Sequence, residues 1–279
     1  MRNEDKSFIG ISPIYHTIIF EMKKQKKKLY FFTVIAILVA VLLSYILQLF
    51  PDYFLSNTQA EFFSGGLTFI SFITLFAACL FFSGIICSEF NKRTGFIVFP
   101  KINKYKLILG KYLGNLILVV LIVSIYYLIL GLFGFLYYGG PINIRIFYSF
   151  GFAVLYVIAL SSFVTLFSSF MKNVNITIII TLVILLMGFN IADQIITLIF
   201  ADAFEPLYSL AYLGNLITST LENPFPASYQ ETSIPMGPGG GFTFAQWITP
   251  SVAMGTTLLL VYIIGCFALA AILFKRRQL

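Results

Sequence analysis

Few side chains of this chain could do chemistry within its long apolar stretches. The only histidine is His16, which lies outside those stretches, so histidine-based metal sites and catalytic triads are not expected within them. Asp193 is the one carboxylate clearly embedded in an apolar stretch. It could contact a substrate or a proton, or it could cap the end of a membrane span close to an interface. Cys79, Cys87 and Cys266 lack CxxC spacing and are expected to be packing residues.

Hydroxyl side chains recur along one apolar stretch. Ser161, Ser162 and Thr165 lie at helical spacing, and two further serines follow one turn later. Such residues let helices pack closely and form weak hydrogen bonds between them. They could also line a polar path for a substrate, which makes these three, together with Asp193, candidate substrate-path residues. An intramembrane transferase or protease would need clustered His, Asp or Glu, so no enzymatic activity is expected.

The connector between the second and third apolar stretches, Ser88–Lys111, combines two features that seldom occur together. It is strongly basic, yet four consecutive apolar residues, Phe96–Phe99, lie in its middle. Pro100 ends that run because proline lacks an N–H and disfavours helix at the preceding residue. An apolar segment between charges needs a surface to bury against, which could be a partner protein or the membrane interface.

The elements that must position these residues are six apolar stretches. The chain has 279 residues, 59% hydrophobic and 10% charged, and a membrane-spanning helix needs about 20 apolar residues. Almost all of the length is used by the stretches and their connectors, so residues 1–279 are expected to form a single all-α, polytopic transmembrane domain without a separate catalytic domain. The predicted spans are Leu29–Phe50, Gly66–Cys87, Leu113–Tyr137, Ile146–Met171, Ile176–Phe200 and Ser251–Phe274.

The distribution of basic residues predicts the topology. All 18 Lys and Arg residues except Arg145 fall on one side of a membrane when the six spans are threaded through it. The positive-inside rule therefore places both termini in the cytoplasm and residues 201–250, which contain no Lys or Arg, outside. Short helices are expected in Phe204–Leu221, and a flexible connector in the Pro- and Gly-rich Asn223–Gly241. The net charge of +7 is expected to face anionic lipid headgroups, and no nucleic-acid partner is expected.

An amphipathic helix is predicted before the first span, over residues 12–28. Ser12 and Pro13 are typical of a helix start. Ile14, Ile18 and Met22 then recur at helical spacing, and a lysine cluster marks the membrane boundary. We expect this helix to lie in the cytoplasmic interface of the membrane.

The connector and its flanks carry a pattern of residues that resembles a known family. Glu89 lies at the inner end of the second span, Thr94-Gly95 and the apolar run follow, and Pro100 and Gly110-Lys111 complete the pattern. With the six spans, this resembles the membrane subunits of ATP-binding-cassette transporters of the type-2 exporter class. The resemblance implies that residues 89–111 form a cytoplasmic coupling loop that contacts a separate ATPase. The implied contact residues are Glu89, Lys92, Arg93, Thr94, Gly95, Phe96, Phe99 and Pro100.

The resemblance also implies partners and a function. The chain has no G-x-x-x-x-G-K-[ST] sequence, so ATP and Mg²⁺ are expected to be bound by partner ATPase subunits, with no cofactor in this chain. Six spans are half of those in such an exporter, which implies a second permease chain in a homo- or heterodimer. The expected function is ATP-driven outward movement of a hydrophobic or amphipathic substrate across a prokaryotic plasma membrane. The alternative is a membrane sensor or scaffold that recruits an ATPase without transport, and the fold does not name the substrate.

Overall fold

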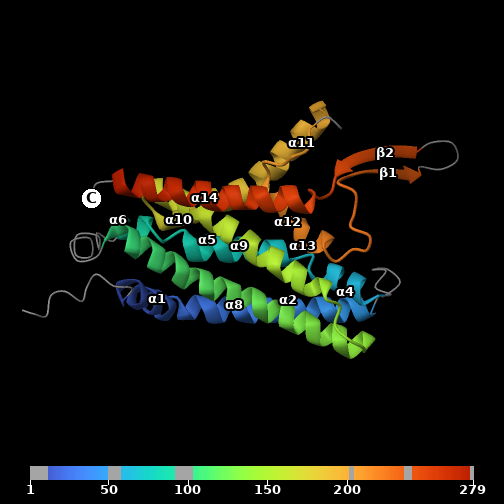
Figure 1. The fold of residues 1–279 in the computed structure, drawn as a ribbon, viewed down its shortest axis with the longest axis horizontal. Coiled ribbons are helices and arrows are strands. Elements are labelled where there is room, and N and C mark those ends of the chain that lie inside the picture. Colours follow the sequence, from blue (N-terminus) through green and yellow to red (C-terminus); the bar gives the residue numbers. More distant parts are fainter. Residues whose placement is uncertain (1–11, 50–57, 92–102, 201–203, 236–240, 277–279) are drawn as a thin grey trace, which may run out of the picture.

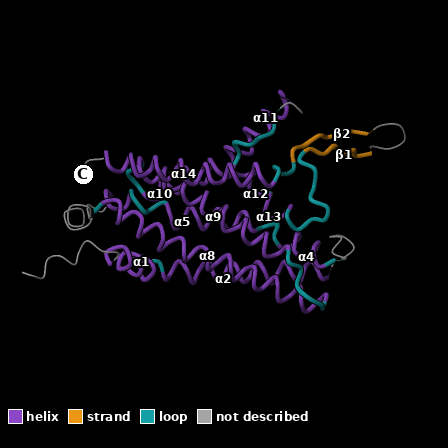
Figure 2. The backbone as a smooth tube through the Cα atoms, in the orientation of Figure 1, coloured by secondary structure: helices purple, strands orange, loops and turns teal. Residues whose placement is uncertain are grey.

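The computed structural model describes residues 12–49, 58–91, 103–200, 204–235 and 241–276. The described chain is helical apart from one antiparallel β-hairpin (Figures 1 and 2). In chain order, its elements are α1 (Ser12–Lys24), α2 (Lys26–Leu49), α4 (Gln59–Gly66), α5 (Ile70–Phe82), α6 (Cys87–Asn91), α8 (Lys104–Tyr138), α9 (Arg145–Phe170), α10 (Val174–Val183), a π-helical turn (Ile184–Gly188), α11 (Phe189–Phe200), α12 (Leu210–Gly214), α13 (Leu216–Ser219), β1 (Tyr229–Pro235), β2 (Gly241–Trp247) and α14 (Val252–Arg276).

Six helical segments of the described chain are long and apolar enough to cross a membrane, which confirms the six predicted spans. The chain is thus a multi-pass membrane protein. Several helical segments are longer than the predicted apolar spans, because a helix can continue into polar residues at the membrane boundary. The third begins well before the predicted Leu113 and includes Lys106 and Lys111. The segments are Lys26–Leu49, Gln59–Phe90, Tyr105–Tyr138, Arg145–Phe170, Val174–Thr197 and Val252–Arg276.

Helix α9 lies at the centre of the bundle and packs against α14, α5 and α8 (Figure 1). Its buried side includes small residues such as Ser149, Ala153 and Ala159, which let neighbouring helices approach closely. Large aromatic side chains of the bundle are also fully buried, among them Tyr126 and Phe82. The amphipathic pattern of these helices is weak because most of them have lipid on one side and an apolar core on the other.

The two ends of the bundle differ in charge. Helix α1, helix α6 and the C-terminal end of α14 lie at one end, and α4, α13 and the hairpin lie at the other (Figure 1). Among the described residues, Arg145 is the only basic residue at the hairpin end. Its guanidinium donates to the backbone carbonyl of Glu222 and, at 2.8 Å, to Oδ1 of Asn223. The lysines of α1, α2, the start of α8 and the end of α14 lie at the other end, in agreement with the predicted asymmetry.

The segment between the fifth and sixth spans contains more regular structure than a loop. Helices α12 and α13 pack against α9, and Leu213 and Leu216 are fully buried. The sequence predicts a flexible connector around the glycine run, whereas β1 and β2 pair on both sides of residues 236–240, from Tyr229 opposite Trp247 to Pro235 opposite Gly241. The cross-strand hydrogen bonds satisfy backbone N–H and C=O groups of both strands, and the composition of this segment alone does not predict that pairing.

Candidate functional site

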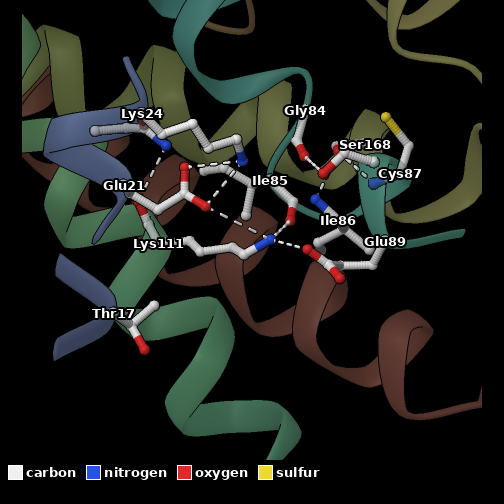
Figure 3. Close-up of polar contacts among 12 residues, drawn as sticks. Thr17, Glu21, Lys24, Gly84, Ile85, Ile86, Cys87, Glu89, Lys111 and Ser168 are labelled. Atoms are coloured by element: carbon white, nitrogen blue, oxygen red, sulfur yellow. Dashed lines mark hydrogen bonds and ion pairs between the residues drawn. The ribbon is translucent and has the colours of Figure 1, made fainter. Parts of the chain in front are cut away.

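A buried cluster of charges joins three helices at the end of the bundle that carries α1 (Figure 3). Lys111 of α8 forms an ion pair with Glu89 of α6, and its Nζ lies 3.7 Å from Oε1 of Glu21 in α1. The same ammonium lies 3.5 Å from the backbone carbonyl of Ile85. Glu21 also pairs with Lys24, one turn further along α1, at 3.0 Å. The cluster therefore connects the two helices that flank the connector with the N-terminal helix.

The charges of this cluster are balanced although three of its four members are almost entirely buried. Glu21, Lys111 and Glu89 are 2%, 5% and 7% exposed, and the Lys24 side chain is 41% exposed. Among the described residues, two carboxylates face two ammonium groups, so removing Lys111 would leave excess negative charge in a poorly solvated place. Breaking a buried ion pair in this way costs about 3–5 kcal/mol, even where forming it gains little net stability.

Close contact between α1 and α8 brings Glu21 within reach of Lys111. Gly110 and Gly114, spaced as in a GxxxG motif, lie against α1. A methyl group on Gly110 would lie 2.7 Å from Cβ of Thr17, and one on Gly114 would lie 3.1 Å from the carbonyl oxygen of Ile18. Because a larger residue would push α1 away, these glycines determine the separation between the backbones. This contact was not predicted from the sequence, and the spacing of the two glycines is the signal that could have revealed it.

The side of α1 that faces the bundle carries buried polar residues beside the half-buried apolar stripe that the sequence emphasised. Thr17 and Glu21 are 8% and 2% exposed and face the bundle, and the apolar residues of the predicted stripe beside them are half-buried. The face that contacts α8 is thus chosen by the glycines and by the charge of Lys111. An unpaired Glu21 in an apolar interface would be unfavourable, so its partner in α8 compensates for its burial.

A break in the second span positions α6 and with it Glu89. Helix α5 ends at Phe82 and α6 begins at Cys87, so the turn between them leaves backbone groups without helical partners. The hydroxyl of Ser168 in α9 accepts hydrogen bonds from the backbone N–H groups of Ile86 and Cys87, each at 3.1 Å, and donates to the carbonyl of Ser83 at 2.7 Å (Figure 3). One side chain of another helix therefore provides hydrogen-bond partners for three backbone groups of the turn.

Of the predicted ATPase-contact residues, the structure describes only Glu89. It lies in α6 directly before the connector and forms the ion pair with Lys111. The other predicted contacts fall in residues 92–102, which lie outside the described residues: Lys92, Arg93, Thr94, Gly95, Phe96, Phe99 and Pro100. Their role stays a prediction.

The predicted substrate-path residues fall in two separate places. The hydroxyls of Ser161 and Ser162 lie 2.7 and 3.0 Å from the Tyr112 hydroxyl, and Thr165 donates to the carbonyl of Ser161. All three α9 side chains are fully buried, as expected for helix packing. Asp193 lies in α11 instead, where it accepts a hydrogen bond from Ser209. A role of these four residues in a substrate path stays a prediction.

The comparison with known proteins gives this chain no family. No protein-family model matches it, and no curated protein sequence is significantly similar to it. The class of the protein therefore rests on its architecture, which is that of a multi-pass membrane protein with six spanning helices.

Proposed function

We propose that this chain is the transmembrane subunit of an ATP-binding-cassette exporter. It moves a hydrophobic or amphipathic substrate outward, and a separate ATPase subunit binds ATP and Mg²⁺ and provides the energy. A second permease chain, identical or different, completes the twelve spans that such an exporter uses. The supporting features are the six spanning helices, the basic connector with its apolar run, and the charge asymmetry between the two ends.

The single observation that carries the proposal is the ion-pair cluster at both ends of the connector. Glu89 precedes the connector, Lys111 follows it, and Lys111 pairs with both Glu89 and Glu21 of α1. A force applied to the connector would thus act on α6, α8 and α1 together. Packed elements with buried ion pairs move as one body more readily than they deform. A coupling loop that transmits the movement of an ATPase needs such a rigid base.

The experiment that tests the proposal is reconstitution of the chain with candidate ATPase subunits in proteoliposomes. We expect the ATPase to bind, and ATP to drive movement of at least one member of a panel of fluorescent amphipathic compounds. The double substitution Phe96→Asp/Phe99→Asp should abolish ATP-dependent transport by placing charges in the contact with the ATPase. Phe225→Asp, on the half-exposed side chain of Phe225 at the hairpin end, serves as the control and should retain transport.

The possible results separate the proposal from its alternative. Transport that persists in full after the double substitution would contradict the assignment of the coupling loop. An ATPase that binds the chain without any ATP-dependent transport would favour a membrane sensor or scaffold. Membrane insertion of both variants, checked by protease protection, shows that the comparison is made between correctly inserted proteins.

A further inference from the structure

A cleft of about 580 Å³ lies between α11, the segment around α12, and β2. The elements that line it, α11, α12 and β2, lie toward the end of the bundle opposite α1 (Figure 1). The π-helical turn precedes α11, which leaves the bundle at an angle toward the hairpin side (Figure 1). The volume is within the range of small-molecule sites. Its lining includes Asp193, Gln194, Tyr212, Asn215, Gln246 and Trp247.

Asp193 brings a carboxylate to this cleft, and no cation among the described residues pairs with it. The Ser209 hydroxyl donates to its Oδ2 at 2.7 Å, and its Oδ1 has no hydrogen-bond partner among the described residues. The described residues also contain no ion pair to this carboxylate. Burial and the adjacent Asp193 carboxylate raise the pKa of the Tyr208 hydroxyl, so this neighbour stays neutral. A carboxylate in an apolar span is usually paired, which makes its lack of a cation informative.

Aromatic and polar groups surround the carboxylate. Trp247 lines the cleft, packs edge-on against Tyr229 at 5.0 Å between ring centroids, and has no partner for Nε1 among the described residues. Tyr212 also lines the cleft and donates to Oε1 of Glu205 at 2.9 Å, so a second carboxylate lies behind it. Residues 201–250 contain no Lys or Arg. The lining of the cleft therefore includes one carboxylate and two aromatic rings, and the buried indole N–H of Trp247 has no partner among the described residues.

We propose that this cleft binds an organic cation that carries a primary ammonium group, a hydrogen-bond acceptor and an apolar body. The ammonium would pair with Asp193, the acceptor would receive the indole N–H of Trp247, and the apolar body would contact the aromatic rings. An anion would meet two carboxylates and no basic residue of this segment. Binding is claimed for the chain itself and does not depend on the proposed export, although in an exporter the cleft would open on the outer side.

Trp247 provides the signal for the test because it is the only tryptophan of the chain. Dansylcadaverine, which has a primary amine, a sulfonamide acceptor and an apolar ring system, is titrated into the purified full-length chain in lipid nanodiscs, with empty nanodiscs subtracted. We expect saturable quenching of Trp247 with energy transfer to the dansyl group. The N-acetylated probe, which has lost its charge, should bind at least about tenfold more weakly.

Three substitutions identify the group that recognises the cation. Asp193→Asn should weaken binding of dansylcadaverine by about tenfold or more, whereas Glu222→Gln, the same change at an exposed site outside the cleft, should leave it unchanged. Gln194→Glu adds a carboxylate to the lining and should tighten binding. The increase in affinity of Gln194→Glu for dansylcadaverine tests recognition of the cation even if Asp193→Asn fails to fold.

Absence of saturable quenching in the wild-type chain would overturn the proposal. Equal affinity for the charged and acetylated probes, or unchanged affinity in both Asp193→Asn and Gln194→Glu, would also overturn it. Since no ATPase is present, these results leave the proposed export untouched, and failure of export would leave the binding result standing.

Discussion

Lys111 faces two carboxylates while it lies almost entirely out of solvent. Its neighbours Glu21 and Glu89 come from different helices, and Lys24 balances the second negative charge. An ammonium in such a place is tolerated only because its partners are fixed around it. The cluster thus serves to hold the helices in one arrangement, and its contribution to net stability is smaller than the penalty for breaking it.

Substitution of Lys111 tests this balance. Lys111→Met keeps most of the side-chain volume but leaves Glu21 and Glu89 facing each other without their shared cation. We expect a loss of about 3–5 kcal/mol in the free energy of unfolding. Lys172→Met, the same change at an exposed site at the same end of the bundle, should change stability by less than about 0.5 kcal/mol. Thermal unfolding in nanodiscs provides the comparison, and equal transition temperatures for the two variants would contradict the role of the cluster.

Part of the cluster could be predicted from the sequence. Glu89 and Lys111 both belong to the pattern that suggested the coupling loop, but nothing in the pattern pairs them, because residues on either side of a connector can meet in many ways. Glu21 lies beside the apolar residues of the stripe, and the apolar pattern alone gives no reason to expect a buried carboxylate among them. Only the packing of α1 on α8 shows that Thr17 and Glu21 are buried.

Helix α1 packs closely on α8 because two residues of α8 at the contact are glycines, which have no side chain. Gly110 and Gly114 allow the two backbones to approach, and Thr17 and Ile18 of α1 fill the space above them. Small residues at a helix crossing occupy little space, so the two backbones can come into close contact. The position of α1 therefore depends on the shape of α8 as well as on the ion pairs.

A pair of alanine substitutions within one helix tests the crossing. Gly110→Ala should destabilise the protein by about 1–3 kcal/mol, because the new methyl group collides with Thr17 and with the carbonyl of Ile14. Gly131→Ala, further along α8, meets nothing within 4 Å and should stabilise the helix by about 0.5–1 kcal/mol. The measurement is again thermal unfolding. A stabilising effect of both substitutions would show that α1 does not pack as described.

The helices were predictable from the sequence to a greater extent than their interruptions. Long apolar runs predict the six spans because the membrane thickness sets their length. The break before Cys87 could not be predicted, since the group that satisfies it, Ser168, lies in another span. The π-helical turn and the hairpin were missed as well. Each depends on contacts between segments that are distant in the sequence or on a small change in helix geometry.

The orientation of the whole molecule follows from its charge distribution and remains a prediction. The described basic residues gather at the end that carries α1 and α6, and the positive-inside rule makes this end cytoplasmic. The cleft beside Asp193 then opens on the outer side. The two ends thus have separate tasks in the proposed exporter, which are contact with the ATPase and contact with a cation outside.

Labelling of introduced cysteines tests the orientation, with the buried Cys79 and Cys87 left in place. In a Cys266→Ala background, which removes the one partly exposed native thiol among the described residues, Phe96→Cys should react with a membrane-impermeant maleimide only after permeabilisation. Glu222→Cys should react in intact cells. Gel-shift analysis of each variant measures the labelled fraction. Labelling of Phe96→Cys in intact cells would reverse the topology and exclude a cytoplasmic ATPase at the connector.

The number of ATP molecules hydrolysed per substrate moved tests the central claim most directly. In proteoliposomes that contain the chain and its ATPase, held below the unfolding transition of each variant, we predict that Lys111→Met keeps ATP hydrolysis but loses most transport. Its ratio of ATP hydrolysed to substrate moved should rise at least about tenfold, whereas Lys172→Met should keep the wild-type ratio. An unchanged ratio in Lys111→Met would mean that the buried ion pairs do not link the connector to the spanning helices.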